Sequence, residues 1–152
     1  GQIRYGIWIG STAVIDSPNS YNDGQWHQVV ATQQRGQQQL FIDGQLVTGR
    51  LGEDVSVEQG TAAARACGLM ILAQLQAALG SLDRVTRVVK LGAFVNSAAT
   101  FTDQPKVANG ASELMVAVFG ESGRHARAAV GVPTLPLGAA VEVDAIVALT
   151  DG

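Results

Sequence analysis

The first fifty residues alternate between hydrophobic and polar positions at the spacing of β-strands. Every second residue near the start is large and apolar, which is the period of a strand with one buried face: Ile3, Tyr5, Ile7 and Ile9. Two more strands are expected over residues 26–34 and 37–42, joined by Arg35 and Gly36, because glycine supplies the positive φ of a tight hairpin. A polar loop over residues 16–24 is expected to precede them.

The rest of the chain alternates helices with strands. Ser56 and Gln59 have the spacing of a capping box, so a helix is expected to begin there and to end at Gly80. Its expected apolar stripe consists of Ala64, Cys67, Ile71, Leu75 and Ala78. A second helix is expected over residues 103–119, with Pro105 in its first turn. Its expected stripe consists of Val107, Ala111, Leu114, Met115 and Val118.

Three strands complete the pattern, over residues 84–96, 126–132 and 140–149. Strict alternation predicts the faces of the first and last strands. In the first, one face carries Val85, Arg87, Val89, Leu91, Ala93 and Val95, and the other carries Val88 and Phe94. In the last, Val141, Val143, Ala145, Val147 and Leu149 share a face. The order predicts an α+β fold with two helices on one face of a mixed sheet. The second face stays apolar, which favours self-association.

Composition narrows the class of protein. The 152 residues are 47% hydrophobic and 15% charged, a globular balance for one domain. A net charge of -3 argues against binding to a phosphate backbone, so no nucleic-acid partner is expected. Cys67 is the only cysteine, so the reducing cytoplasm is the expected compartment. Without an uninterrupted apolar run of about 18 residues, no membrane span is expected. His27 and His125 lack a carboxylate cluster, so no metal is expected.

A series of motifs in the second part of the chain is similar to one subgroup of the RidA (YjgF-type) family. In order, they are Phe94-Val95-Asn96-Ser97, the stretch FTDQPKV at 101–107, GRHAR at 123–127, Leu135-Pro136, and VEVDA at 141–145. From Asp43 onward their spacing matches that subgroup. The resemblance implies a chorismate-mutase-like fold, a homotrimer with ligand clefts between subunits, and cofactor-free hydrolysis of enamines or imines derived from amino acids, a deaminase reaction.

The resemblance also implies site residues. In the family an arginine binds the substrate carboxylate and a glutamate positions water, and these positions match Arg127 and Glu142. A guanidinium is a two-pronged clamp for carboxylate, and a carboxylate can orient water. The cleft asparagine is matched by Asn109. His125 shares a strand face with Arg127, either as a ligand-binding or catalytic group or as a half-exposed residue at the strand end. From the residues alone, Arg127 and Glu142 on neighbouring strands could instead form a structural ion pair.

Two departures from the family pattern favour an alternative function. The family's Ser-Gly-Gln loop is absent, and Ala129 stands where many deaminating members have cysteine. Cys67 lies on an apolar helical stripe and is expected to be a buried structural thiol rather than a nucleophile. The leading hypothesis is a trimer whose clefts bind small carboxylates or imino acids. The alternative is a folded oligomeric scaffold without native activity.

The N-terminal part resembles another family. The stretches DGQWHQVV at 23–30 and LFIDGQLV at 40–47 are similar to the central hairpin of a laminin-G/concanavalin-A-like jelly roll, but are too short to form a two-sheet sandwich. The expectation is a chimera joined at the string 43–47. In it, residues 1–42 are the jelly-roll-derived segment, and their hairpin over residues 26–42 replaces the hairpin at the sheet edge of a RidA-like domain over residues 43–152. The two parts are expected to form one folded unit. Of the three functions considered, carbohydrate binding by the jelly-roll-like part is the least expected.

Overall fold

The computed structural model describes residues 4–8, 12–16, 29–34, 37–42 and 47–150 of the chain. The contacts between its residues divide it into two units, residues 1–45 and 46–152. Each unit is described by itself.

The first unit contains two antiparallel strand pairs. Strand β1 (Arg4–Trp8) pairs with β2 (Thr12–Asp16), and β3 (Val29–Gln34) pairs with β4 (Gln37–Ile42). In the second pair Gln34 is opposite Gln37, the register expected for a two-residue connection. The predicted strands are therefore present, and β2 is an additional one. Most of the polar loop predicted over residues 16–24 lies outside the described residues.

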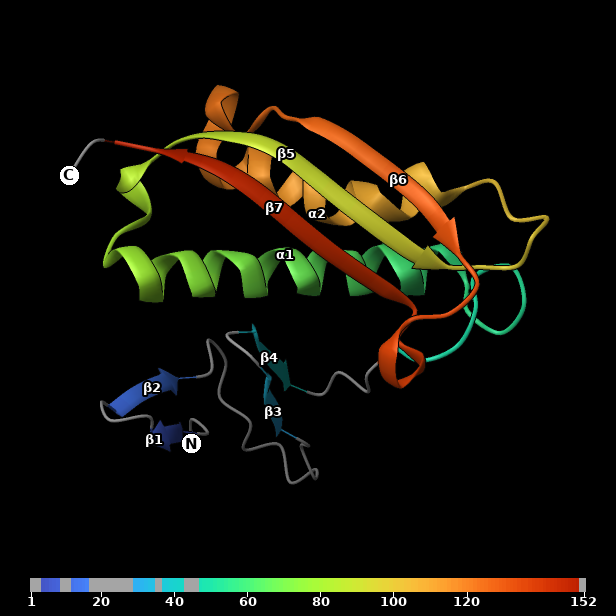
Figure 1. Ribbon diagram of the computed structural model, residues 1–152, viewed down its shortest axis with the longest axis horizontal. Helices are drawn as coiled ribbons and strands as arrows, with labels where there is room; N and C mark the ends of the chain where they lie inside the picture. The colour runs from blue at the N-terminus through green and yellow to red at the C-terminus, as the bar shows by residue number, and fades with distance from the viewer. Residues whose placement is uncertain (1–3, 9–11, 17–28, 35–36, 43–46, 151–152) are drawn as a thin grey trace. The chain divides into compact units, whose positions relative to one another are not determined.

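The second unit is a three-stranded mixed sheet backed by two helices. Strand β5 (Val85–Asn96) is central, β6 (Ala126–Val132) runs parallel to it on one side, and β7 (Val141–Leu149) runs antiparallel on the other. Helices α1 (Val57–Leu79) and α2 (Gln104–Phe119) both lie on one face of this sheet (Figure 1). Three short 3-10 turns connect the elements: Leu82–Arg84, Gly120–Gly123 and Pro136–Gly138. The predicted architecture is confirmed for this unit.

Helix α1 begins and ends where the sequence predicts. The Ser56 hydroxyl accepts from the Gln59 amide at 3.2 Å, and the Gln59 side chain accepts from the Ser56 amide at 2.8 Å. Gly80 ends the helix with a φ of 79°. The predicted stripe is wrong in part, because the fully buried line runs through Gly60, Ala64, Gly68 and Leu72, and Ala78 is exposed.

Glycine explains the displaced stripe of α1. A Cβ at Gly68 would lie 2.9 Å from the side chain of Leu114 on α2, so the missing side chain lets the two helices approach closely. The glycines in this contact line have no side chain, so they leave no hydrophobic stripe in the sequence. On α2 the predicted positions Val107, Ala111, Leu114 and Met115 are buried. Val118 is 43% exposed instead, and the neighbouring Phe119 packs against the core at this end of the helix.

Strand β5 departs from simple alternation. Its pairing with β7 shifts register between Val85 and Arg87 and again between Val88 and Lys90. Each such bulge inserts a residue, so successive buried positions in this part of the strand are three residues apart. Val88 is consequently fully buried and Val89 is 43% exposed, the reverse of the prediction from strict alternation. Leu149, near the end of β7, is also exposed.

By length and composition alone α1 could cross a bilayer, since an 18-residue window of it has a mean hydropathy of 1.4. Glutamines interrupt the helix, so it contains no continuous apolar run of that length. The core helix of a globular domain gives the same profile, and α1 packs Ala64 and Leu72 into the core of its unit.

Gly110→Ala should strongly destabilise the fold. Its new methyl group would collide with the carbonyl oxygen of Thr61, which belongs to the backbone of α1. Overpacking lowers the free energy of unfolding by about 1–3 kcal/mol, and by more where the backbone must move. Urea unfolding followed by circular dichroism measures the loss.

Gly92→Ala is the matched control. There the methyl group would collide with the carboxylate of Asp144, the end of a side chain that can rotate away. We expect a loss well under about 1 kcal/mol. Equal stability of the two variants would contradict the close helix approach at Gly110.

Candidate functional site

Arg127 lies near the start of β6 and reaches over α2. It is aligned with Leu91 of β5, whose side chain is buried in the core, so Arg127 emerges on the helix side of the sheet. Its Nη1 donates to Asn109 Oδ1 at 2.8 Å and to Ser112 Oγ at 3.1 Å. Asn109 and Ser112 are three residues apart on α2 and therefore share a helix face. The guanidinium is thus oriented by two hydrogen bonds.

His125 extends this network. Its Nδ1 lies 2.6 Å from the carbonyl oxygen of Gly123, and its Nε2 lies 3.0 Å from Ser112 Oγ. A carbonyl oxygen only accepts, so Nδ1 carries the proton in this contact. In the neutral ring Nε2 is then an acceptor for the Ser112 hydroxyl. The hydrogen bonds consequently run in one direction, from Arg127 to Ser112, from Ser112 to His125, and from His125 to Gly123.

Three of the four predicted site residues therefore converge, and Ser112 connects two of them. The sequence analysis missed Ser112, because its partners are separated from it along the chain by 13 and 15 residues. The only sequence signal is its i, i+3 spacing from Asn109 on a predicted helix. Recognising its role requires knowing that the start of β6 packs beside that helix face.

One edge of the Arg127 guanidinium makes no hydrogen bond within the described second unit. Within residues 47–150, the hydrogen bonds of its side chain use Nη1, and neither Nε nor Nη2 has a protein partner. The side chain is exposed. Nε and Nη2 together form the planar edge that binds carboxylates with two parallel hydrogen bonds.

An open hollow of about 370 Å³ adjoins this network on α2. It is lined by Ser112, Glu113, Val116 and Ala117, four residues of the same helix. Ser112 belongs both to the lining of this hollow and to the hydrogen-bonded network of Arg127 and His125. A small organic group placed against Val116 and Ala117 would therefore lie next to Ser112.

Glu142 lies away from this network. It is aligned with Phe94 of β5, and its neighbour Asp144 faces Gly92 on the side of the sheet away from the helices. Arg127 emerges on the helix side, and β5 separates the two strands. The expectation of neighbouring strands and a structural ion pair between Arg127 and Glu142 is therefore wrong. Alternate positions of a strand point to opposite faces, which keeps the two apart within one chain.

Cys67 is a largely buried thiol beside β7. Its Sγ lies 3.8 Å from the carbonyl oxygen of Val141. Burial, followed by the negative charge of Glu142, raises the pKa of the thiol to about 11. The thiolate is therefore scarce near neutral pH, which makes Cys67 a poor nucleophile.

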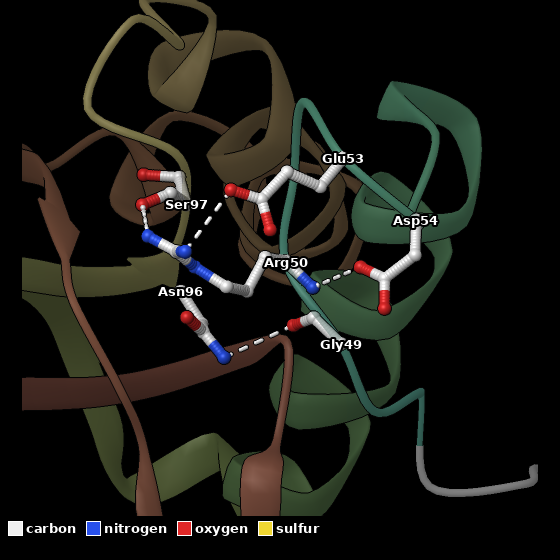
Figure 2. Close-up of polar contacts among 6 residues, drawn as sticks. All are labelled: Gly49, Arg50, Glu53, Asp54, Asn96 and Ser97. Carbon is white, nitrogen blue, oxygen red and sulfur yellow. Dashed lines mark hydrogen bonds and ion pairs between the residues drawn. The ribbon is translucent and has the colours of Figure 1, made fainter.

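Residues at the end of β5 hold the frame of the unit together (Figure 2). The Asn96 amide donates to the carbonyl oxygens of Gly49 at 3.0 Å and Ala139 at 3.4 Å. Arg50 donates from Nη2 to the Ser97 carbonyl oxygen at 3.1 Å and from Nη1 to Glu53 at 3.0 Å. Asn96 and Ser97, part of the family-like motif at 94–97, are buried and make structural contacts.

No metal site is assembled in the described part of the chain, since no three His, Cys, Asp or Glu side chains gather there.

Comparison with known proteins identifies the relatives of this chain. A family model described as "YjgF/chorismate_mutase-like, putative endoribonuclease" matches residues 17–149. A curated protein of Trypanosoma cruzi, Protein TCP17, is 59% identical over 122 residues, which cover 74% of this chain and 76% of that protein.

Two solved structures are similar as well. Protein Atu1372 of Agrobacterium tumefaciens, described as of unknown function, superposes with a TM-score of 0.68 at 52% identity, covering 69% of this chain and 68% of the other. A putative endoribonuclease of Shewanella oneidensis superposes with a TM-score of 0.64 at 30% identity, covering 82% and 84%.

The matched region begins well before Asp43. The family model starts at residue 17, so the family pattern includes the hairpin of β3 and β4. Nothing in these matches supports a jelly-roll origin for residues 1–47 or a junction at the string 43–47. Short strings such as DGQ are common in turns of many families, which explains why a fragment of this length is a weak signal.

Cys67 should react slowly with an aromatic disulfide reagent, because a pKa of about 11 leaves roughly one thiol in a thousand ionised at about pH 8. Its reactivity should rise as the pH approaches 11. Glu142→Gln should accelerate the reaction a few-fold, since it removes the negative charge that helps to raise the pKa. The release of the coloured thiol is followed by absorbance.

Asp144→Asn serves as the matched control for that experiment. Asp144 lies on the same face of β7 as Glu142, but its carboxylate does not contribute to the pKa of Cys67. It should leave the rate unchanged. Identical rates for Glu142→Gln and the parent chain would place Glu142 too far from Cys67 to act on it.

Proposed function

Because the chain belongs to the YjgF/chorismate-mutase-like family, we propose that it binds small carboxylates, imino acids among them, through Arg127 and hydrolyses the imines in clefts between subunits. The single observation that carries this proposal is the Arg127 guanidinium, which two hydrogen bonds orient while its Nε and Nη2 edge has no partner among residues 47–150.

The Arg127 contacts suit recognition of a carboxylate. Asn109 and Ser112 hold Nη1, so the side chain loses little conformational freedom when a ligand binds. Charge-assisted hydrogen bonds are worth about 1.5–3 kcal/mol each, enough to hold a small anion at a surface site. The proposed ligands are 2-imino acids and related small carboxylates.

Hydrolysis requires a group that handles water, and we assign it to Glu142. Within one chain Glu142 faces the opposite side of the sheet from Arg127, so the two can act together only if Glu142 comes from a second copy. Water held by its carboxylate would add to the imine carbon. Glu142 would take the proton of the water and return it to nitrogen. The new hydroxyl then gives its proton to nitrogen as the C–N bond breaks, which releases a 2-oxo acid and ammonia.

Exposed apolar residues support the assembly that this arrangement needs. Val130 is aligned with Phe94, and Ile146 with Lys90, so both lie on the sheet face away from the helices. Ile146 is 57% exposed, although it is a large apolar side chain in the edge strand β7. Covering this face with other copies favours association, and we propose a homotrimer.

We further propose that the β3–β4 hairpin and residues 46–152 form one folded unit. Support comes from the family match, which runs from residue 17 to residue 149 without a break at the boundary between the two units.

The rival proposal is a folded oligomer that has no catalytic activity. It is favoured by Ala129, which replaces the cysteine found in many deaminating members with a side chain unable to act on a substrate. The two proposals differ in ligand binding. A small 2-oxo acid that binds the folded state must raise the melting temperature, whereas an inert scaffold shows no shift.

Arg127→Ala should lower kcat/KM for 2-iminopropanoate, generated in situ, by about 10- to 100-fold, because it removes one or two charge-assisted hydrogen bonds to the carboxylate. Arg127→Lys keeps the charge without the planar edge and should fall in between. Loss of the imine is followed by absorbance.

Arg124→Ala is the control, because Arg124 is an exposed arginine nearby that pairs with Glu121. Its kcat/KM should equal that of the parent. Equal rates for the parent and Arg127→Ala would exclude the proposed carboxylate site.

Ile146→Glu should dissociate the oligomer, since it places a charge in the face that we propose to be covered. Light scattering coupled to size exclusion should give the mass of one chain for this variant and of three for the parent. Leu137→Glu is the control, because Leu137 is 80% exposed in the turn before β7. A single-chain mass for the parent would contradict the trimer.

A further inference from the structure

The Ser112 hydroxyl is held in the geometry of an activated nucleophile. It lies 3.0 Å from His125 Nε2, and the tautomer set by Gly123 makes that nitrogen the acceptor of the hydroxyl proton. In helices a serine hydroxyl commonly bonds the carbonyl oxygen four residues earlier, but here it is directed to His125. The proposed imine hydrolysis uses Ser112 only to hold Arg127 and gives no role to the hydrogen bond between Ser112 and His125.

The histidine is oriented by a rigid neighbour. The Gly123 carbonyl accepts from Nδ1 at 2.6 Å, the position that a carboxylate occupies in a serine–histidine–aspartate triad. A Cβ at Gly123 would collide with the backbone carbonyl of Met115, so the turn at Gly120–Gly123 is packed tightly against α2. This close packing places His125 beside Ser112.

A positively charged donor completes the arrangement. Arg127 Nη1 lies 3.1 Å from Ser112 Oγ, and an oxygen on a carbon bonded to Oγ would come within reach of the same guanidinium. Such a donor stabilises the oxyanion that forms during acyl transfer. The open hollow lined by Val116 and Ala117 adjoins Ser112 and offers space for a short acyl chain.

We propose that Ser112 and His125 form an acyl-transfer centre that hydrolyses small activated esters with short acyl chains, a function separate from imine hydrolysis although it shares Arg127. Ser112 Oγ forms a bond to the acyl carbon while its proton passes to His125 Nε2. The bond to the alcohol breaks, and His125 protonates the departing oxygen. Water, deprotonated by His125, then releases the acid, and the proton returns to Ser112 Oγ.

A purely structural reading of the same contacts is that Ser112 only links His125 to Arg127. The two readings differ in one observable, since a structural hydroxyl bonded to a histidine forms no covalent adduct. An alkyl fluorophosphonate traps activated serines irreversibly and is therefore the first probe. A chromogenic acetate ester is the second, because it reports on turnover.

With the full chain, we expect one phosphonate adduct by intact mass, located on Ser112 by peptide mass spectrometry. Ser112→Ala should abolish the adduct. Ser122→Ala should retain it, because Ser122 is an exposed serine in the turn at Gly120–Gly123. No adduct on the parent chain, or one on another residue, would overturn the proposal, and this readout holds even if Ser112→Ala fails to fold.

His125→Ala should slow adduct formation and ester hydrolysis by about 100-fold, as expected for loss of a general base. Added imidazole should restore part of the rate, a response that a merely structural histidine would not show. Undiminished labelling in His125→Ala would exclude the histidine as the base. Glu142→Gln should leave labelling of Ser112 unchanged, so failure of the imine proposal and failure of this one remain distinguishable.

Discussion

The folded unit depends on hydrogen bonds at the end of β5, where Asn96 joins three stretches of chain. Its backbone N–H donates to the Ala140 carbonyl oxygen, and its backbone carbonyl accepts from the Leu51 N–H, both at 2.9 Å. Its side-chain amide donates to the Gly49 carbonyl oxygen at 3.0 Å. Asn96 is only 4% exposed. Losing these bonds would leave buried carbonyl groups unpaired, which costs more than the bonds themselves contribute. The segment before α1 and the start of β7 are thereby tied to the central strand.

With that frame in place, close helix packing determines where the site forms. Glycines on α1 and α2 let the two helices approach, and Gly123 lets the turn after α2 pack against the same helix. These contacts bring the start of β6 over one face of α2. Asn109 and Ser112 on that face then orient Arg127 and meet His125. The site therefore depends on glycines whose missing side chains allow these close contacts.

The two faces of the sheet carry different chemical groups. The helix side carries Arg127, which suits a carboxylate, together with the Ser112 and His125 pair, which suits acyl transfer. The opposite side carries Glu142 among exposed apolar residues such as Val130 and Ile146. A single chain keeps Arg127 and Glu142 apart, so any reaction that uses both depends on assembly. A reaction at Ser112 does not.

The sequence alone determined the element order, the capping of α1 at Ser56 and Gly80, and the family to which the motifs after Asp43 belong. These follow from local spacing, because hydrogen-bond capping and amphipathic periodicity involve residues a few positions apart. It also indicated Arg127, Asn109 and His125. Only the tertiary structure decided that bulges bury Val88 instead of Val89, that Ser112 links Arg127 to His125, and that Glu142 faces away from both. Each of these three features depends on which strand or helix packs beside the residue. Local periodicity carries no information about contacts between segments that are distant in the chain.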